Sequence, residues 1–326
     1  MLQFILNFTI FVQNLNAMKH FGRNCPPSIL IHCYQRSLDG RIIFYNVRDR
    51  LVYFTLFCVI ADRYDVRVLK LCLMPDHVHM VVTVDRPETL SDFVRDLSSS
   101  FARRYNALCG RKGELFDSPF GSAPKIGDKK ARTCLTYVDN NPVERRLCRY
   151  AEQYRWNFIA YSQDPAPFSK PIRRRHCSRP LLRAIDVTDF RHKEHKYLSY
   201  RELCRIMEPL KKEEIEQLTD YIISKYSILD YSAGERFFGG YHEMISAAHN
   251  NTGSEYDLNE VFVGRTDAVY SQMSNILLTD FGFKDIHEIT VLPIERKVEI
   301  MRYMSGRVSA TAVQFAKYLH LPSVFK

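Results

Sequence analysis

Several signatures of other protein classes are missing from this chain of 326 residues. Its nine cysteines include no pair closer than eight residues, so there is no CxxC zinc knuckle and no disulfide framework. No GxxxxGK[ST] sequence occurs, which argues against a nucleotide cofactor. The apolar stretch in residues 1–17 is interrupted by Asn and Gln and is too short to span a bilayer. We interpret it as a loose arm or an over-extended start, and a signal anchor is the alternative. These absences favour a cytoplasmic protein without a membrane partner.

The composition indicates packed domains and an anionic partner. Hydrophobic residues make up 46% and aromatic residues 13% of the chain, which is long enough for two domains. The net charge is +9, and residues 170–212 alone carry 13 Lys and Arg against 5 Asp and Glu. Such a basic segment favours binding to DNA, and hence a nucleoid-associated location, although a solvated charged surface would give the same pattern. Arg173, Arg174 and Arg175 are the candidate DNA contacts within it.

The first half of the chain alternates between strand and helix patterns. The predicted elements are a strand in 28–37, a helix over 47–64, strands over 65–74 and 77–84, a helix over 89–110, a Gly-containing strand segment, and a helix that ends before Pro142. A tight turn at Pro75 and Asp76 joins the two central strands. This order predicts an α+β fold of the ferredoxin-like class, an antiparallel sheet with helices on one face.

The second half lacks strand signals. Its predicted helices cover 213–226, 235–249, 267–280, 293–304 and 309–320. The predicted organisation is therefore an arm at 1–17, the α+β domain at 18–168, a basic linker at 169–212 and a mainly α-helical domain at 213–326. With Ser309 as N-cap of its second helix, 293–320 would form a helix-turn-helix. A plain helical bundle used for packing or dimer contacts is the alternative.

Two histidines lie two positions apart in the apolar run LMPDHVHMVV, residues 73–82. Side chains alternate along a strand, so His77 and His79 project from one face about 6–7 Å apart, a separation that one cation can bridge. Burial of two imidazoles costs roughly several kcal/mol unless their nitrogens are paired. The pattern therefore indicates a metal site, and two satisfied histidines on a half-exposed strand are the alternative. Asp76 either orients one imidazole or serves only the turn.

Tyr137 and Asn141 are spaced by one helical turn, away from the apolar stripe of their helix. A phenol attacks a phosphate once a cation polarises that phosphate, and a carboxamide is an oxygen ligand for such a cation. Imidazole and carbonyl ligands with open positions suit Mg²⁺ or Mn²⁺. Because Asn141 precedes a proline, its alignment with Tyr137 is less fixed than the spacing implies. A tyrosine that only packs against the sheet is the alternative.

A family resemblance rests on five segments that span about residues 28–160. They are HCYQRSLDGRIIFY, LCLMPDHVHMVV, FARRYN, GELFDSPF and YVDNNPVERRL, in that order. In these motifs the chain resembles the single-tyrosine HUH transposases, the IS200-like group, and most closely the REP-associated tyrosine transposases. The resemblance implies a ferredoxin-like catalytic domain, a divalent metal held by His77, His79 and Asn141, and Tyr137 as nucleophile. It also implies cleavage and rejoining of single-stranded or hairpin DNA through a 5′-phosphotyrosine.

Further DNA contacts are expected near this site from cationic, amide and aromatic side chains: Gln35, Arg36, Arg103, Arg104 and Tyr105. Solvated surface is the alternative for each of them. Two other functions stay open, a catalytically relict sequence-specific DNA-binding regulator and an HUH nuclease of the replication-initiator or relaxase kind. A homodimer is a candidate assembly.

Overall fold

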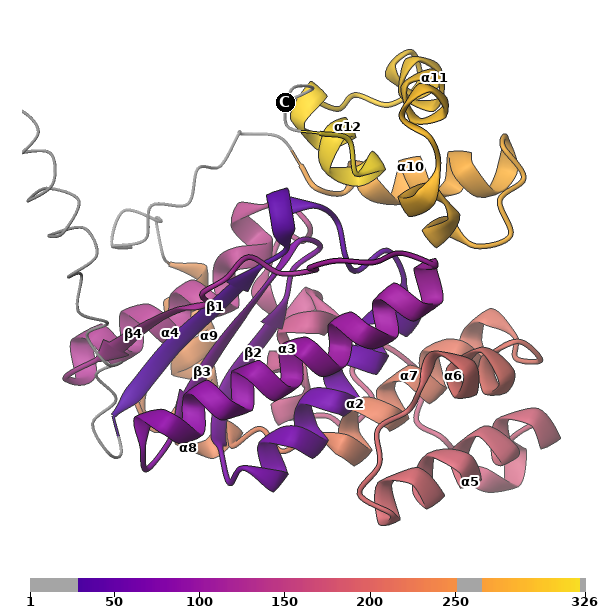
Figure 1. Ribbon diagram of the computed structural model, residues 1–326. Helices are drawn as coiled ribbons and strands as arrows, with labels where there is room; N and C mark the ends of the chain where they lie inside the picture. The colour runs from indigo at the N-terminus through magenta and orange to yellow at the C-terminus, as the bar shows by residue number, and fades with distance from the viewer. Residues whose placement is uncertain (1–28, 251–265, 323–326) are drawn as a thin grey trace, which may run out of the picture.

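The first half of the chain forms a four-stranded antiparallel sheet. The computed structural model describes residues 29–250 and 266–322, so the predicted arm at 1–17 lies outside the described residues. The strands β1 (Leu30–Arg36), β2 (Arg67–Leu73), β3 (His77–Thr83) and β4 (Gly121–Lys125) lie in the order β2-β3-β1-β4 (Figure 1). With α2 (Val47–Arg63) after β1 and α3 (Pro87–Cys109) after β3, the order is that of the ferredoxin-like fold. The predicted fold class is confirmed.

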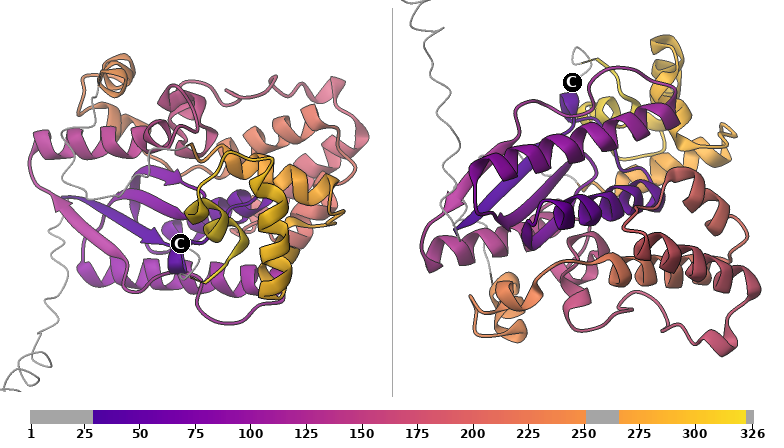
Figure 2. Two further views of the ribbon diagram at one scale, coloured as in Figure 1. Left: turned by 90° about the horizontal axis from the view of Figure 1, so that it is seen from above. Right: turned by 60° about the horizontal axis from the view of Figure 1, so that its bottom comes forward.

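Helices cover both faces of this sheet. On one face α2 and α3 bury side chains such as Ile31, Met80 and Phe101. On the other face α4 (Asp128–Glu144) packs Leu135 against Leu69 and neighbouring residues. Figure 2 (left) shows the sheet between α4 and α3. The expectation of helices on one face therefore holds for α2 and α3 but not for α4. The side chains of β2 and β3 are buried on both faces of the sheet, so both faces are covered.

The helix α4 runs through Pro142 to Glu144, whereas the sequence predicted an end before the proline. Pro142 lies in the last turn, where its missing N–H removes a single helical hydrogen bond. The hydrogen-bond pattern resumes at once, since the Arg145 N–H donates to the Asn141 carbonyl at 3.1 Å. Asn141 therefore stays helical and keeps its place one turn after Tyr137.

The second half is mainly α-helical, as predicted. Its helices are α5 (Arg179–Lys193), α6 (Tyr200–Met207), α7 (Lys212–Tyr226), α8 (Tyr231–Glu235), α9 (Tyr241–His249), α10 (Val269–Thr279), α11 (Ile294–Ser305) and α12 (Ala312–Leu319). Short 3₁₀ helices are η1 (Leu38–Gly40), η2 (Ala151–Gln153), η3 (Arg155–Asn157), η4 (Ile159–Ser162), η5 (Arg174–His176) and η6 (Ile286–Val291). No helix in the described part of the chain has the length and hydropathy needed to cross a bilayer.

The basic segment 169–212 is folded rather than extended. It contains α5 and α6, whose Leu181 and Leu203 belong to the same hydrophobic cluster as α2. The apolar faces of these helices find their partner on the outer side of the α+β domain (Figure 1). The domain boundaries drawn from the sequence stay a prediction.

The last three helices, α10 to α12, form a second hydrophobic core around Met273, Ile300 and Phe315. We call residues 266–322 the C-terminal unit. Its α12 has Thr311 as N-cap, not the predicted Ser309, because the Thr311 hydroxyl accepts from the Gln314 N–H and Gln314 completes a capping box. Whether α11 and α12 act as a helix-turn-helix stays a prediction.

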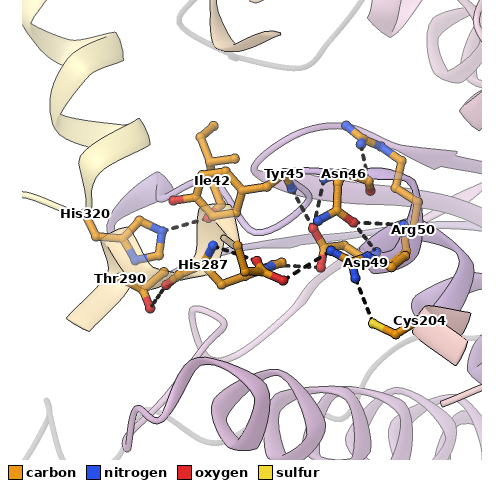
Figure 3. Close-up of polar contacts among 11 residues, drawn as sticks. Ile42, Tyr45, Asn46, Asp49, Arg50, Cys204, His287, Thr290 and His320 are labelled. Atoms are coloured by element: carbon orange, nitrogen blue, oxygen red, sulfur yellow. Dashed lines mark hydrogen bonds and ion pairs between the residues drawn. The ribbon is translucent and has the colours of Figure 1, made fainter. Parts of the chain in front are cut away.

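The C-terminal unit docks on the connection between β1 and α2. The Tyr45 hydroxyl donates to the Tyr318 carbonyl at 2.6 Å, and His320 Nε2 donates to the Ile42 carbonyl at 2.7 Å. Figure 3 shows His320 beside Ile42 of this connection and His287 beside Asp49 in the first turn of α2, where His287 Nε2 lies 2.9 Å from Asp49 Oδ1. These contacts hold the C-terminal unit at the end of the sheet where the β2–β3 turn also lies (Figure 1).

Candidate active site

The two histidines of β3 occupy the sheet face that α4 covers. His77 is paired with Arg36 of β1 and His79 with Tyr34, so all four side chains project from that face. The two imidazole rings are 4.8 Å apart between centroids and nearly perpendicular. His77 is 3% exposed and His79 is fully buried. Strand alternation thus places both rings side by side, as the sequence predicted, and removes both from bulk water.

Asp76 fixes the protonation pattern of His77. Burial alone would raise the pKa of Asp76, but His77 and Lys317 hold it well below its usual range, so the group is a carboxylate. A carboxylate only accepts hydrogen bonds, and its Oδ1 lies 2.6 Å from His77 Nδ1. Nδ1 therefore carries the proton, and in the neutral ring Nε2 carries the lone pair. This Nε2 is buried and has no hydrogen-bond partner among the residues that the structure describes.

A third histidine, His32, orients the ring of His79. Burial, together with the nearby His77 and His32, lowers the pKa of His79 well below its ordinary value, so this ring is neutral. The amide nitrogen of Asn141 donates to His79 Nε2 at 3.3 Å. The proton of His79 is therefore on Nδ1, which donates to His32 Nε2 at 3.0 Å. In its neutral form each β3 histidine thus has an Nε2 lone pair that points away from its supporting partner.

The helix α4 brings Tyr137 and Asn141 over these rings. The Asn141 amide nitrogen donates to the Tyr137 hydroxyl at 3.2 Å, and the Tyr137 ring stands edge-on to His79 at 5.4 Å between centroids. Tyr137 is 2% and Asn141 1% exposed. The Asn141 carbonyl oxygen is buried, and within residues 29–250 and 266–322 it has no hydrogen-bond partner. One helical turn therefore presents a phenol and a carboxamide to the histidine pair.

The donor atoms fit a divalent cation. A buried polar atom without a partner costs about 1–3 kcal/mol, and His77 Nε2 and the Asn141 carbonyl oxygen are two such atoms in one site. Both are metal ligands in proteins, and so is the Nε2 lone pair of His79. In the described residues no group of three or more His, Cys, Asp and Glu side chains could hold a metal. The candidate set of two imidazoles and one carboxamide would leave coordination positions open.

Four predicted DNA contacts lie on or against the opposite face of the sheet. Gln35 is buried and accepts a hydrogen bond from Ser98 of α3, in the wall of a cavity of about 490 Å³. Arg103 is exposed on α3. The guanidinium carbon of Arg104 lies 4.4 Å from the centroid of the Tyr197 ring. Tyr105 is fully buried in the main core. A stacking role for Tyr105 does not fit this placement, because a base cannot reach its ring.

The remaining predicted contacts are exposed. Arg36 ends β1 on the histidine face, with its guanidinium carbon 6.0 Å from the centroid of the Tyr34 ring. Arg173, Arg174 and Arg175 lie at the surface around η5, where Arg174 pairs with Asp189 at 3.0 Å. The structure brings Arg36 to the site, whereas the η5 arginines belong to the helical region next to α5. Their role in DNA binding stays a prediction.

Two residues of the site were not found from the sequence. His32 alternates with Tyr34 in β1, but only the pairing of β1 with β3 brings it to His79. Lys317 belongs to α12, and its ammonium group lies 2.6 Å from Asp76 Oδ2. No local pattern could have indicated the second contact, since 241 positions separate the two residues.

Comparison with known proteins agrees with the motif resemblance. Residues 30–141 match the model of a family described as "Transposase IS200 like". A solved structure of a REP-associated tyrosine transposase bound to a REP hairpin is similar at 15% identity and a TM-score of 0.36, over 43% of this chain and 81% of that chain. No curated protein matches. The matched segment ends at Asn141 and includes the histidines and the tyrosine, so over residues 30–141 the chain is similar to the IS200-like transposases.

Proposed function

We propose that this protein cleaves and rejoins single-stranded, hairpin-containing DNA with Tyr137 as the nucleophile. The observation that carries the proposal is the contact of the Tyr137 hydroxyl with Asn141, whose amide also touches His79. The match of residues 30–141 to a transposase family supports the same function. Nucleophile, orienting amide and candidate metal ligands thus occupy one buried site.

The reaction exchanges one phosphodiester for another. The phenolic oxygen of Tyr137 forms a bond to phosphorus and its proton is released, while the bond from phosphorus to the 3′ oxygen breaks and that oxygen takes up a proton. The products are a 5′-phosphotyrosine and a free 3′-hydroxyl. Because a bond of the same type replaces the one that is broken, rejoining needs no nucleotide cofactor. Asn141 would hold the phenolic oxygen in place for the attack.

A divalent ion, Mg²⁺ or Mn²⁺, would be held by His77, His79 and Asn141, and when bound it would supply positive charge to the scissile phosphate. The chain adds positive charge of its own. Arg36 and Arg145 contribute to lowering the pKa of His79, so both lie close enough to affect the potential in the site. A positive potential attracts the phosphates of a DNA strand. Because Tyr137 is buried, a covering element has to move before a phosphate reaches its hydroxyl.

The test is the formation of a covalent adduct. The full chain would be incubated with single-stranded oligonucleotides that carry hairpins, with Mn²⁺, Mg²⁺ or a chelator, and a protein–DNA species that resists denaturation would be sought by gel electrophoresis. We expect a metal-dependent adduct in the wild type and none with Tyr137→Phe. Tyr34→Phe is the matched control, because Tyr34 lies on the same sheet face with its ring 6.5 Å from His79.

Two outcomes contradict the proposal. An adduct that persists in Tyr137→Phe would assign the nucleophile to another residue. Tight hairpin binding without an adduct, with both metals, would favour the alternative of a DNA-binding regulator whose catalytic core is a relict.

A further inference from the structure

A lysine of the C-terminal unit contacts the candidate active site. Lys317 of α12 donates to Asp76 Oδ2 at 2.6 Å, and its side chain is 22% exposed. The other oxygen of Asp76 accepts from His77 Nδ1 at 2.6 Å. The carboxylate therefore has one partner in the C-terminal unit and one in the metal site. The chain of contacts runs from α12 through the β2–β3 turn to a candidate ligand.

The backbone around this contact is arranged to admit the lysine. Gly40 lies beside the contact of Lys317 with Asp76 and has φ +63°, a conformation that favours glycine. A Cβ at Gly40 would lie 3.2 Å from Lys317 Cε and 3.9 Å from Asp76 Oδ2. The Ile42 N–H donates to the Lys317 carbonyl at 3.1 Å, and the Ser37 N–H donates to the Asp76 carbonyl at 2.9 Å. Both ends of the lysine–aspartate pair are thus fixed on the same turn after β1.

The pair also controls which atom of His77 can bind a cation. Asp76 is 6% exposed, so its charge needs partners inside the protein. With Oδ2 held by Lys317, Oδ1 is left to fix the His77 ring and keep its proton on Nδ1. Without the lysine the carboxylate could rotate, and the Nε2 lone pair would lose its fixed direction. Carboxylates behind metal-binding histidines act in this way in general.

We propose that Lys317 is a positioning residue of the metal site, acting through Asp76 on His77, so that docking of the C-terminal unit completes the site. This inference rests on the proposed function, because it assumes that His77 binds a cation. It assigns to the C-terminal unit a task inside the active site in addition to any contact with DNA.

The experiment measures Mn²⁺ affinity of the full chain from the free Mn²⁺ signal in electron paramagnetic resonance. Lys317→Met should weaken Mn²⁺ binding about tenfold, the lower end of the range for residues behind a ligand. Lys317→Arg should restore most of the affinity, since it can still donate to Asp76. Tyr45→Phe is the matched control: it removes the bond to the Tyr318 carbonyl at the same interface but leaves Asp76 untouched, and should bind Mn²⁺ like the wild type.

A double-mutant cycle separates positioning from a general effect on the fold. If Lys317 acts only through Asp76, adding Lys317→Met to Asp76→Asn should change the affinity by less than about twofold. An equal loss in both backgrounds, or wild-type binding by Lys317→Met, would overturn the inference. A wild-type chain that is folded by circular dichroism but binds no Mn²⁺ would instead overturn the proposed metal site, and the inference with it.

A second readout needs no metal. In the metal-free wild type, nuclear magnetic resonance of the His77 ring should show a protected proton on Nδ1. Lys317→Met should speed its exchange with water, whereas Tyr45→Phe should not. Unchanged exchange in Lys317→Met would count against the inference even if metal binding were lost for another reason.

Discussion

Replacement of His287 with Gln should remove a pH-dependent contribution to stability at the interface of the C-terminal unit. His287 Nε2 lies 2.9 Å from Asp49 Oδ1, and its Nδ1 lies 2.5 Å from Asp285 Oδ1. Both nitrogens face carboxylates, Nε2 that of Asp49 (Figure 3) and Nδ1 that of Asp285, so the ring is protonated and donates from both. Burial alone would lower the pKa of His287, but Asp49 and Asp285 raise it to about 10. Folding of this region is therefore coupled to the binding of one proton by His287.

The magnitude follows from the two pKa values. The ordinary value is 6.5 and the folded value about 10. At about 1.4 kcal/mol for each pH unit, this interval corresponds to at most about 5 kcal/mol. Because the folded pKa is raised, the stabilisation is fully present below pH 6.5 and is lost as the pH rises through 10. The estimate agrees with the cost of about 3–5 kcal/mol for breaking a buried charge pair.

The assay is urea unfolding at pH 6.5 and at pH 9.5, with hydrogen exchange in α10–α12 as the local readout. We expect His287→Gln to lose about 3–5 kcal/mol at pH 6.5 and much less at pH 9.5. His320→Asn is the control at the same interface: burial lowers the pKa of His320 to about 3, so it does not titrate in this range. Lys297, whose pKa burial lowers to about 8, is present in every variant and cancels in the comparison. The reasoning would be refuted if the free energy of unfolding changed between pH 6.5 and pH 9.5 by the same amount in the wild type and in His287→Gln.

Two further predictions concern elements that hold the site. Lys70 donates to both oxygens of Asp139 at 2.9 and 2.8 Å, and the two side chains are 5% and 1% exposed. Lys70→Met would leave the buried carboxylate of Asp139 unpaired. We therefore expect it to lower the free energy of unfolding by about 3–5 kcal/mol, measured by chemical denaturation. Adding Asp139→Leu should recover most of this loss, and no recovery would contradict the explanation. Gly121→Ala would place a Cβ 2.1 Å from the Tyr34 ring, so we expect a loss of about 1–3 kcal/mol in thermal unfolding. Ser122→Ala, one residue further along β4, should change stability by no more than about 0.5 kcal/mol, and an equal effect of both substitutions would argue against the contact with Tyr34.

Much of the local structure could be predicted from the sequence, because its causes are local. The turn at Pro75 and Asp76, the strands on each side of it, and the helices now seen as α7, α10, α11 and α12 follow from turn residues and hydrophobic periodicity. The placement of His77 beside His79 needs only the alternation of side chains along a strand. Likewise Tyr137 and Asn141 meet because they are four residues apart on a helix.

The sequence was less informative where the burial of a residue depends on segments that are distant in the sequence. Tyr105 follows two arginines in a helix pattern that suits a DNA-binding surface as well as a core, and only the packing of α3 on the sheet and beside His287 decides for the core. Gln35 and Arg36 are neighbours in β1 and therefore point to opposite faces, so only one of them lies on the face of the histidines. The pairing of β1 with β3 decides that Arg36, and not Gln35, lies on the face of the histidines.

The sequence by itself determined the chemistry of this protein: a histidine pair on one strand, and a phenol and a carboxamide on one helix. The tertiary structure alone decided how these groups are supported. The register of β1 against β3 brings His32 to His79, the packing of α4 on Leu69 and Val81 brings this helix over the histidines, and the docking of α12 brings Lys317 to Asp76. Hydrophobic periodicity describes residues that are close in the sequence. The three contacts above depend instead on which surfaces of distant segments cover one another, and this is decided only when the whole chain packs.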